Sequence, residues 1–136
     1  MDSAVRIYEP SNIYGTPQLG RNVKIGAYCD LGSADIGDNV SIGAFGFIPG
    51  KIRIEDGAWL GPRVTFTHTF PPATPDDWKE TVVGRNVKIG ASVTILCGIH
   101  IGDNAVIGAG SVVTKDVPPG ETWAGVPARP INNKIT

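Results

Sequence analysis

The fold is decided by residues 83–113, which read VGRNVKIGASVTILCGIHIGDNAVIGAGSVV. An aliphatic residue recurs there every six positions, at Val83, Ile89, Ile95, Ile101, Ile107 and Val113. A second small or β-branched residue stands two positions before most of these. Six is not a helical period, so the repeat predicts short strands that each end in a tight turn.

The same phase extends toward the N-terminus. It runs through Ile13, Leu19, Ile25 and Leu31 and, after one five-residue step, through Ile36, Ile42, Ile48, Ile54, Leu60 and Phe66. Strands of three or four residues and three corners predict a triangular coil of 18 residues, with the glycine after each aliphatic giving the corner conformation. Coils stacked about 4.8 Å apart would form a prism of about six coils with an Ile and Val interior.

Composition and charge agree with an all-β domain and narrow the class of protein. The chain has 136 residues, 18 Gly, 11 Pro, and 28 Ile plus Val against four Leu. A net charge of -1 with scattered basic residues argues against nucleic acid or an anionic membrane as a partner. The absence of a signal-like start and of a long apolar run predicts a soluble, cytoplasmic protein. Two cysteines without metal or redox spacing predict free thiols.

Three segments of this sequence resemble the hexapeptide-repeat acyltransferase family. They are residues 107–119 (IGAGSVVTKDVPP), 124–129 (AGVPAR) and 54–67 (IEDGAWLGPRVTFT), and the last is similar to N-acetyltransferases that modify nucleotide-linked amino sugars. The resemblance covers Ile13 to about Pro130. It implies a left-handed parallel β-helix, acetyl-CoA as co-substrate and a homotrimer with sites between subunits. We therefore expect a β-helix domain over 1–117, interrupted by a loop at 67–82, and a cap and tail over 118–136.

The loop interrupts the repeat once and contains the main catalytic candidate. Phe66 and Val83 are 17 positions apart instead of six, so 11 residues are inserted. A proline-rich insertion on a regular scaffold is a typical place for function. His68 lies at its mouth, and an imidazole suits removal of a proton from an attacking amine or hydroxyl. The alternatives are an insertion without function and a histidine that only faces solvent.

The sequence leaves three functions open, of which two differ in the acceptor atom. Amino-sugar N-acetyltransferases of the family typically carry Asn where this chain has His68, whereas related O-acetyltransferases use a loop histidine as the base. We expect N-acetylation of a nucleotide-linked amino sugar, with O-acetylation of a sugar or other hydroxyl acceptor and a non-catalytic scaffold as alternatives. Zinc carbonic anhydrases on the same prism need three histidines, and this chain has only His68 and His100, so no metal is expected.

Binding residues are predicted for both substrates. Small residues that would accommodate the pantetheine arm are Ala91, Ser92, Ala109 and Gly110, and the expected phosphate partners are Lys115 and Arg129. On the acceptor side the candidates are Arg63, for a diphosphate, and Asp77 and Glu80, for hydroxyl groups.

Two further residues have alternative roles. His100, on a regular coil, is expected to be an exposed structural residue rather than a competing base. Trp123 is expected either to cover the adenine or to close the end of the prism. The prolines at 127 and 130 are expected to hold the tail extended along the side.

Overall fold

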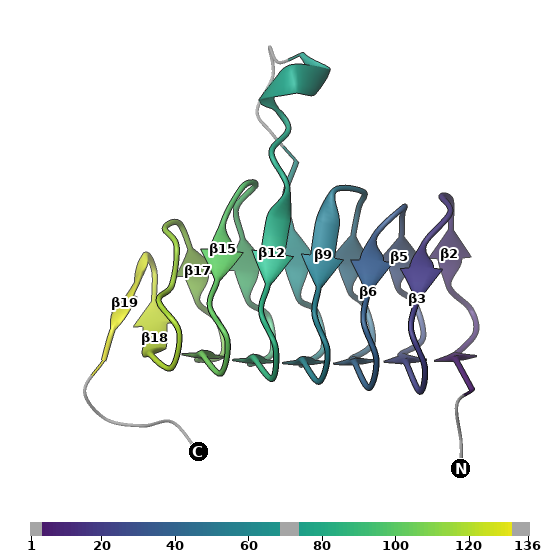
Figure 1. Ribbon diagram of the computed structural model, residues 1–136, viewed down its shortest axis with the longest axis horizontal. Helices are drawn as coiled ribbons and strands as arrows, with labels where there is room; N and C mark the ends of the chain where they lie inside the picture. Colours follow the sequence, from purple (N-terminus) through teal and green to yellow (C-terminus); the bar gives the residue numbers. More distant parts are fainter. Residues whose placement is uncertain (1–3, 69–73, 132–136) are drawn as a thin grey trace.

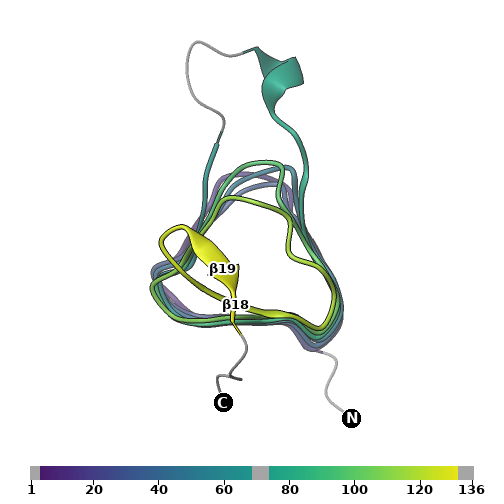
Figure 2. The ribbon, with the colours of Figure 1, turned by 90° about the vertical axis from the view of Figure 1, so that its left-hand side faces the viewer.

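The computed structural model describes residues 4–68 and 74–131 and shows a left-handed parallel β-helix (Figures 1 and 2). Its strands form three sheets, which we call sheets A, B and C. Sheet A contains β1 (Arg6–Ile7), β4 (Lys24–Ile25), β7 (Ser41–Ile42), β10 (Trp59–Leu60), β13 (Lys88–Ile89), β16 (Val106–Ile107), β18 (Thr122–Gly125) and β19 (Ala128–Pro130).

Sheets B and C form the other two walls of the triangle. Sheet B contains β2 (Asn12–Ile13), β5 (Asp30–Leu31), β8 (Phe47–Ile48), β11 (Thr65–Phe66), β14 (Thr94–Ile95) and β17 (Val112–Val113). Sheet C contains β3 (Gln18–Leu19), β6 (Asp35–Ile36), β9 (Ile52–Ile54), β12 (Thr81–Val83) and β15 (His100–Ile101). One 3-10 helix, η1 (Pro75–Asp77), lies in the protruding loop.

The coil predicted from the hexads is confirmed by the pairing of every third strand. Leu60 pairs with Ile89, and Ile89 pairs with Ile107, in parallel and in register. Most strands have two residues rather than the expected three or four. The strands are short because each is followed almost at once by a corner. Many corner residues adopt the left-handed conformation, with φ near +60°.

The interior of the prism is the predicted ladder of aliphatic side chains. Phe66, Ile89, Ile95 and the other inward positions of the central coils are buried. Ile13 departs from the pattern with 44% of its surface exposed. It lies on β2, the edge strand of sheet B, so no coil covers it on the N-terminal side.

The corner glycines do not have the role predicted for them. Gly26 has no left-handed φ, but a Cβ there would lie 2.5 Å from the backbone nitrogen of Ala44 in the next coil. The left-handed conformation falls two positions later, for example at Asn39 (φ 59°) and Asn104 (φ 63°). The glycine is therefore needed for the close approach of coils, and asparagine takes the strained corner, which it tolerates better than most residues.

The C-terminal segment closes the prism as a hairpin. β18 continues sheet A beside β16, and β19 turns back antiparallel to it, so the expectation of a tail extended along the side was wrong (Figure 2). Trp123, 8% exposed, pairs with Ile107 and belongs to the core cluster. Of its two expected roles, the structure shows closure of the end.

The expectation of free thiols is confirmed within the described residues. Cys29 and Cys97 are both free, and burial raises the pKa of the Cys29 thiol. In the parts of the chain that the structure describes, we find no helix with the length and apolar character needed to cross a membrane.

Candidate functional site

The protruding loop leaves and re-enters the prism at the corner between sheets B and C, which we call the B–C corner (Figures 1 and 2). The side-chain oxygen of Thr67 accepts a bond from the Cys97 N–H at 3.2 Å, and that of Thr81 accepts one from the Gly98 N–H at 3.0 Å. Thr81 is buried. Both ends of the loop are therefore hydrogen-bonded to one turn of the next coil, which fixes the points where the loop leaves and re-enters the prism.

His68 is exposed on the outgoing arm of this loop, and two aromatic rings contact its imidazole. Phe47, from β8 in the preceding coil, lies 5.7 Å away between ring centres, and Trp78, from the returning arm, lies 4.6 Å away. Both contacts are tilted by 54°. The imidazole is thus bracketed on the scaffold yet open to solvent, as a proton acceptor for a bound substrate must be.

Lys51 holds the returning arm against the prism. Its Nζ donates a hydrogen bond to the Trp78 carbonyl oxygen at 3.1 Å and lies 5.8 Å from the centre of the indole ring. Its own carbonyl accepts the Thr81 N–H at 3.0 Å. The sequence did not single out Lys51 or Phe47. Their hexad positions mark them only as corner and wall residues, and no local signal connects them with a loop more than 15 residues away.

The two loop carboxylates predicted for the acceptor side have partners within the chain. The Asp77 Oδ2 accepts bonds from the Thr74 N–H (2.8 Å) and the Thr74 hydroxyl (3.2 Å), and the first of these lowers the pKa of Asp77 below its usual value. Glu80 lies 3.8 Å from the Arg53 guanidinium, with both side chains about half exposed. These contacts stabilise the loop; binding of substrate by either carboxylate stays a prediction.

The small residues predicted for coenzyme A lie together at the corner between sheets A and B, which we call the A–B corner. Ser92 donates its N–H to Pro62 and Gly110 donates to Ala91, so these positions stack from coil to coil. The predicted residues at this corner are Ala91, Ser92, Ala109 and Gly110. A Cβ on Gly110 would meet no atom within 4 Å, so the surface beside it is open.

Arg63 belongs to this A–B corner and not to the loop. Its guanidinium lies 4.7 Å from the centre of the Phe45 ring, which in turn stacks on Tyr28 at 5.1 Å with an interplanar angle of 6°. All three residues have φ near +60°, a conformation that costs bulky side chains about 1–2 kcal/mol each. The structure therefore brings Arg63 together with the small residues and separates it from His68.

The two predicted phosphate partners lie in different places. Lys115 follows β17 on the way to Val117, which bridges to Ile101, so it lies at the B–C corner in the last coil. Arg129 lies on β19 of the end hairpin, where its Nη1 donates to the carbonyl oxygen of Ala128 at 3.0 Å. Both side chains are exposed.

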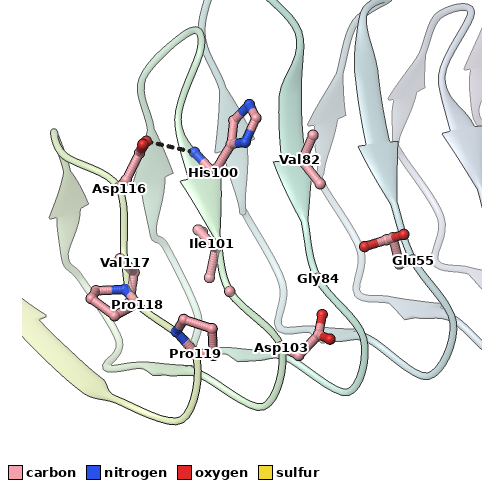
Figure 3. Close-up of a pocket in the computed structure, with 11 residues that line it drawn as sticks. Glu55, Val82, Gly84, His100, Ile101, Asp103, Asp116, Val117, Pro118 and Pro119 are labelled. Carbon is pink, nitrogen blue, oxygen red and sulfur yellow. Dashed lines mark hydrogen bonds between the residues drawn. The ribbon is translucent and has the colours of Figure 1, made fainter.

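A groove of about 400 Å³ on sheet C brings further charged residues together (Figure 3). Val82, Pro118 and Pro119 line it alongside Glu55, His100, Asp103 and Asp116, and the Asp116 carboxylate accepts the His100 backbone N–H at 2.9 Å. His100 is exposed, as predicted, but it lines this hollow rather than a flat wall. Three carboxylates with no Lys or Arg in the lining disfavour a phosphate-bearing ligand here.

No group of three or more His, Cys, Asp or Glu suited to a metal ion occurs within residues 4–68 and 74–131.

Comparison with known proteins places these features in context. A family model described as bacterial transferase hexapeptide (six repeats) matches residues 80–115. The chain is 44% identical over 87 residues to the galactoside O-acetyltransferase of Escherichia coli K12, covering 59% of this chain and 43% of that protein. It spans between about a fifth and two fifths of the length of the curated relatives that it matches.

Solved structures share the fold. A mutant of perosamine N-acetyltransferase from Caulobacter crescentus, in complex with CoA and GDP-perosamine, superposes with a TM-score of 0.85 at 22% identity over 97% of this chain and 58% of that one. A mutant of AntD, an N-acyltransferase from Bacillus cereus, in complex with dTDP and coenzyme A, superposes with a TM-score of 0.75 at 26% identity, over 96% and 78% of the two chains.

Proposed function

We propose that this chain, whose residues 80–115 match the bacterial transferase hexapeptide model, transfers an acetyl group from acetyl-CoA to an amino group of a nucleotide-linked amino sugar. The observation that carries the proposal is the exposed imidazole of His68, bracketed by Phe47 and Trp78 on the single insertion in the repeat. The similarity to AntD, an N-acyltransferase in complex with dTDP and coenzyme A, supports a nucleotide-linked acceptor.

The proposed reaction is direct attack with His68 as the base. The acceptor nitrogen forms a bond to the thioester carbonyl carbon while the amine proton passes to the imidazole of His68. The carbon–sulfur bond then breaks, and the proton passes to the departing thiolate, giving the amide and free coenzyme A. A backbone N–H must stabilise the oxygen of the tetrahedral intermediate. His68 supplies the imidazole of this loop in its described residues, and an imidazole suits both proton transfers.

The A–B corner fits the donor substrate. The pantetheine arm is narrow, and exposed small residues such as Ala109 and Gly110 let it lie against the backbone, where a larger side chain would fill the open surface beside Gly110. We propose that Lys115 and Arg129 bind the phosphates of coenzyme A. For the acceptor, Arg63 would bind the diphosphate. Within the described loop both Thr74 bonds go to Oδ2 of Asp77, which leaves Oδ1 to bind a sugar hydroxyl. Glu80, which lies 3.8 Å from the Arg53 guanidinium, is the second carboxylate proposed to bind a hydroxyl group.

A homotrimer explains why these groups lie apart in one chain. The small residues occupy the A–B corner, whereas His68 lies on the loop at the B–C corner, across the width of sheet B. A loop that reaches the A–B corner of a neighbouring chain would bring base and thioester together. Cyclic symmetry would then give three identical sites. We place this reaction in the cytoplasm, the compartment expected from the sequence.

A second candidate acceptor is a sugar hydroxyl. It is favoured by the 44% identity to a galactoside O-acetyltransferase and by a histidine that can take the proton of an alcohol as readily as that of an amine. The remaining alternative, a scaffold without catalysis, needs no affinity for coenzyme A.

The test is a screen of sugar nucleotides bearing 3-amino or 4-amino groups beside hydroxyl acceptors, with wild type, His68→Ala and His68→Asn. We expect an amino sugar to react and His68→Ala to lose about 10²–10⁴ in kcat/KM, the usual contribution of a general base. His100→Ala is the matched control and should retain activity.

Three results would contradict parts of this proposal. Full kcat/KM in His68→Ala would show that His68 is not the base. Activity in His68→Asn but not in His68→Ala would make the residue a hydrogen-bonding group that positions the acceptor. Calorimetry without coenzyme A binding up to millimolar concentration would remove the transferase and leave the scaffold.

A further inference from the structure

The imidazole of His68 takes part in a contact between the two arms of the loop. The rings of Phe47, His68 and Trp78 lie in series, with the imidazole in the middle and both ring pairs tilted by 54°. Tilted contacts of this kind favour particular relative orientations, unlike a general apolar surface. Phe47 belongs to the scaffold, since it lies on β8, whereas Trp78 belongs to the loop itself.

Trp78 is held in turn from the prism. The Nζ of Lys51 donates to its carbonyl oxygen at 3.1 Å and lies 5.8 Å from the indole centre, within range of a cation–π interaction. A Cβ at Gly50 would lie 3.7 Å from the Cη2 atom of Trp78, so the edge of the indole reaches the backbone of this corner. The Lys51 carbonyl is itself bonded to Thr81, which fixes the lysine backbone at the base of the loop.

The polar atom of the indole makes no comparable contribution. Its Nε1 is buried without a hydrogen-bond partner among the described residues. A buried donor without a partner is unfavourable, so its removal does not weaken the fold. The contribution of Trp78 at this position therefore lies in the shape of its ring, which phenylalanine reproduces in part and alanine does not.

We propose that Trp78 is a positioning residue for His68, and that Lys51 holds Trp78 in place. The inference rests on the proposed function, because it concerns the base of that reaction. In this arrangement Trp78 touches neither substrate nor reacting atoms. The indole restricts the His68 imidazole to the orientation in which the proton-accepting nitrogen of His68 faces the acceptor. Loss of the indole therefore lowers kcat, while the KM for acetyl-CoA stays the same.

The kinetic test compares Trp78→Ala, Trp78→Phe and Lys51→Met with two matched controls on sheet A, Trp59→Ala and Lys24→Met. We expect Trp78→Ala to lower kcat by about 10- to 100-fold, because a misplacement of about 1 Å costs up to that factor. Trp78→Phe should recover to within a few-fold of wild type, and Lys51→Met should fall between the two. The controls, exposed on another wall, should keep the wild-type kcat.

A second readout does not depend on turnover. The indole of Trp78 shifts the NMR resonances of the His68 ring protons through its ring current, and these shifts should disappear in Trp78→Ala and weaken in Lys51→Met. Unchanged His68 resonances in both variants would overturn the proposal. So would a wild-type kcat in Trp78→Ala, or an equal loss in Trp78→Phe and Trp78→Ala.

The two proposals fail in different ways. If His68→Ala keeps full activity while Trp78→Ala still changes the His68 resonances, the contact orients His68 but His68 is not the base, and the catalytic role proposed for His68 is wrong. If His68→Ala is inactive and Trp78→Ala is fully active, the assignment of His68 as the base is supported and the positioning role of Trp78 is wrong.

Discussion

Single residues at the corners decide how closely the coils stack. Gly26 lies at a corner where the next coil passes over its α-carbon, whereas Asn39 takes a left-handed conformation at another corner. Asn39 also accepts a hydrogen bond at 3.0 Å from the side-chain amide of Asn22 in the preceding coil. The glycine and the asparagine of the repeat thus meet two separate requirements, one for space and one for backbone conformation.

We predict that Gly26→Ala destabilises the protein by about 1–3 kcal/mol, the usual cost of overpacking, because the added methyl would lie 2.5 Å from the Ala44 nitrogen. Denaturant unfolding measures the change. Gly46→Ala is the matched control, since its nearest neighbour would be the Cys29 Sγ at an ordinary 3.5 Å. Equal stability of the two variants would show that coil spacing does not depend on the glycine.

At the scale of elements, the hexads predicted the wall strands and their inward residues, but not the strand lengths or the closing hairpin. The wall strands repeat one contact in every coil, so their pattern is visible in the sequence. The pairing of β18 with β19 occurs once and has no period. For the same reason the partners of His68 could not be predicted: Phe47 looks like any wall residue until the loop folds over it.

The loop contains one element whose stability should depend on pH. The Thr74 N–H bond to Asp77 lowers the pKa of that carboxyl in the folded turn. A lowered folded-state pKa stabilises the turn above the unfolded value of 3.8, and this stabilisation is lost as the pH falls through the folded value. The contribution of this bond to the stability of the turn is therefore fully present at neutral pH and decreases only below about 3.8.

The Thr74 amide resonance followed against pH tests this. We expect a titration with its midpoint below the ordinary Asp value in wild type and in the control Asp76→Asn, and no such titration in Asp77→Asn. A midpoint above 3.8 would show that Thr74 does not stabilise the ionised carboxylate.

At the scale of the whole molecule, the groups proposed for catalysis lie at two corners of one triangle. His68 and Lys115 belong to the B–C corner, and Arg63, Ser92 and Gly110 belong to the A–B corner. Sheet B separates these two sets of groups on a single prism. In the proposed homotrimer, the loop of one chain and the A–B corner of its neighbour would complete the site, so the assembly would be part of the active site.

Subunit mixing tests this arrangement. We expect His68→Ala and Ala109→Trp, which places a large side chain on the exposed surface of the A–B corner, each to be inactive as pure trimers. Mixed trimers should regain about a quarter of the wild-type activity, because with random assembly one site in four pairs an intact loop with an intact A–B corner. No recovery after verified exchange of subunits would place the whole site within one chain. The same conclusion would follow if the protein sedimented as a monomer and that monomer had full activity.

The sequence by itself determined the prism: its period of six, its inward Ile and Val ladder, its single insertion and the candidate base within it. The period and the ladder follow from side-chain size and backbone conformation repeated in every coil, so they appear many times along the chain, and the insertion is visible as the interruption of that pattern. Only the tertiary structure decided that Arg63 lies with the small residues, that Phe47 and Trp78 bracket His68, and that the tail closes the end. These contacts each form once, between segments far apart in the sequence, and depend on how particular side chains pack.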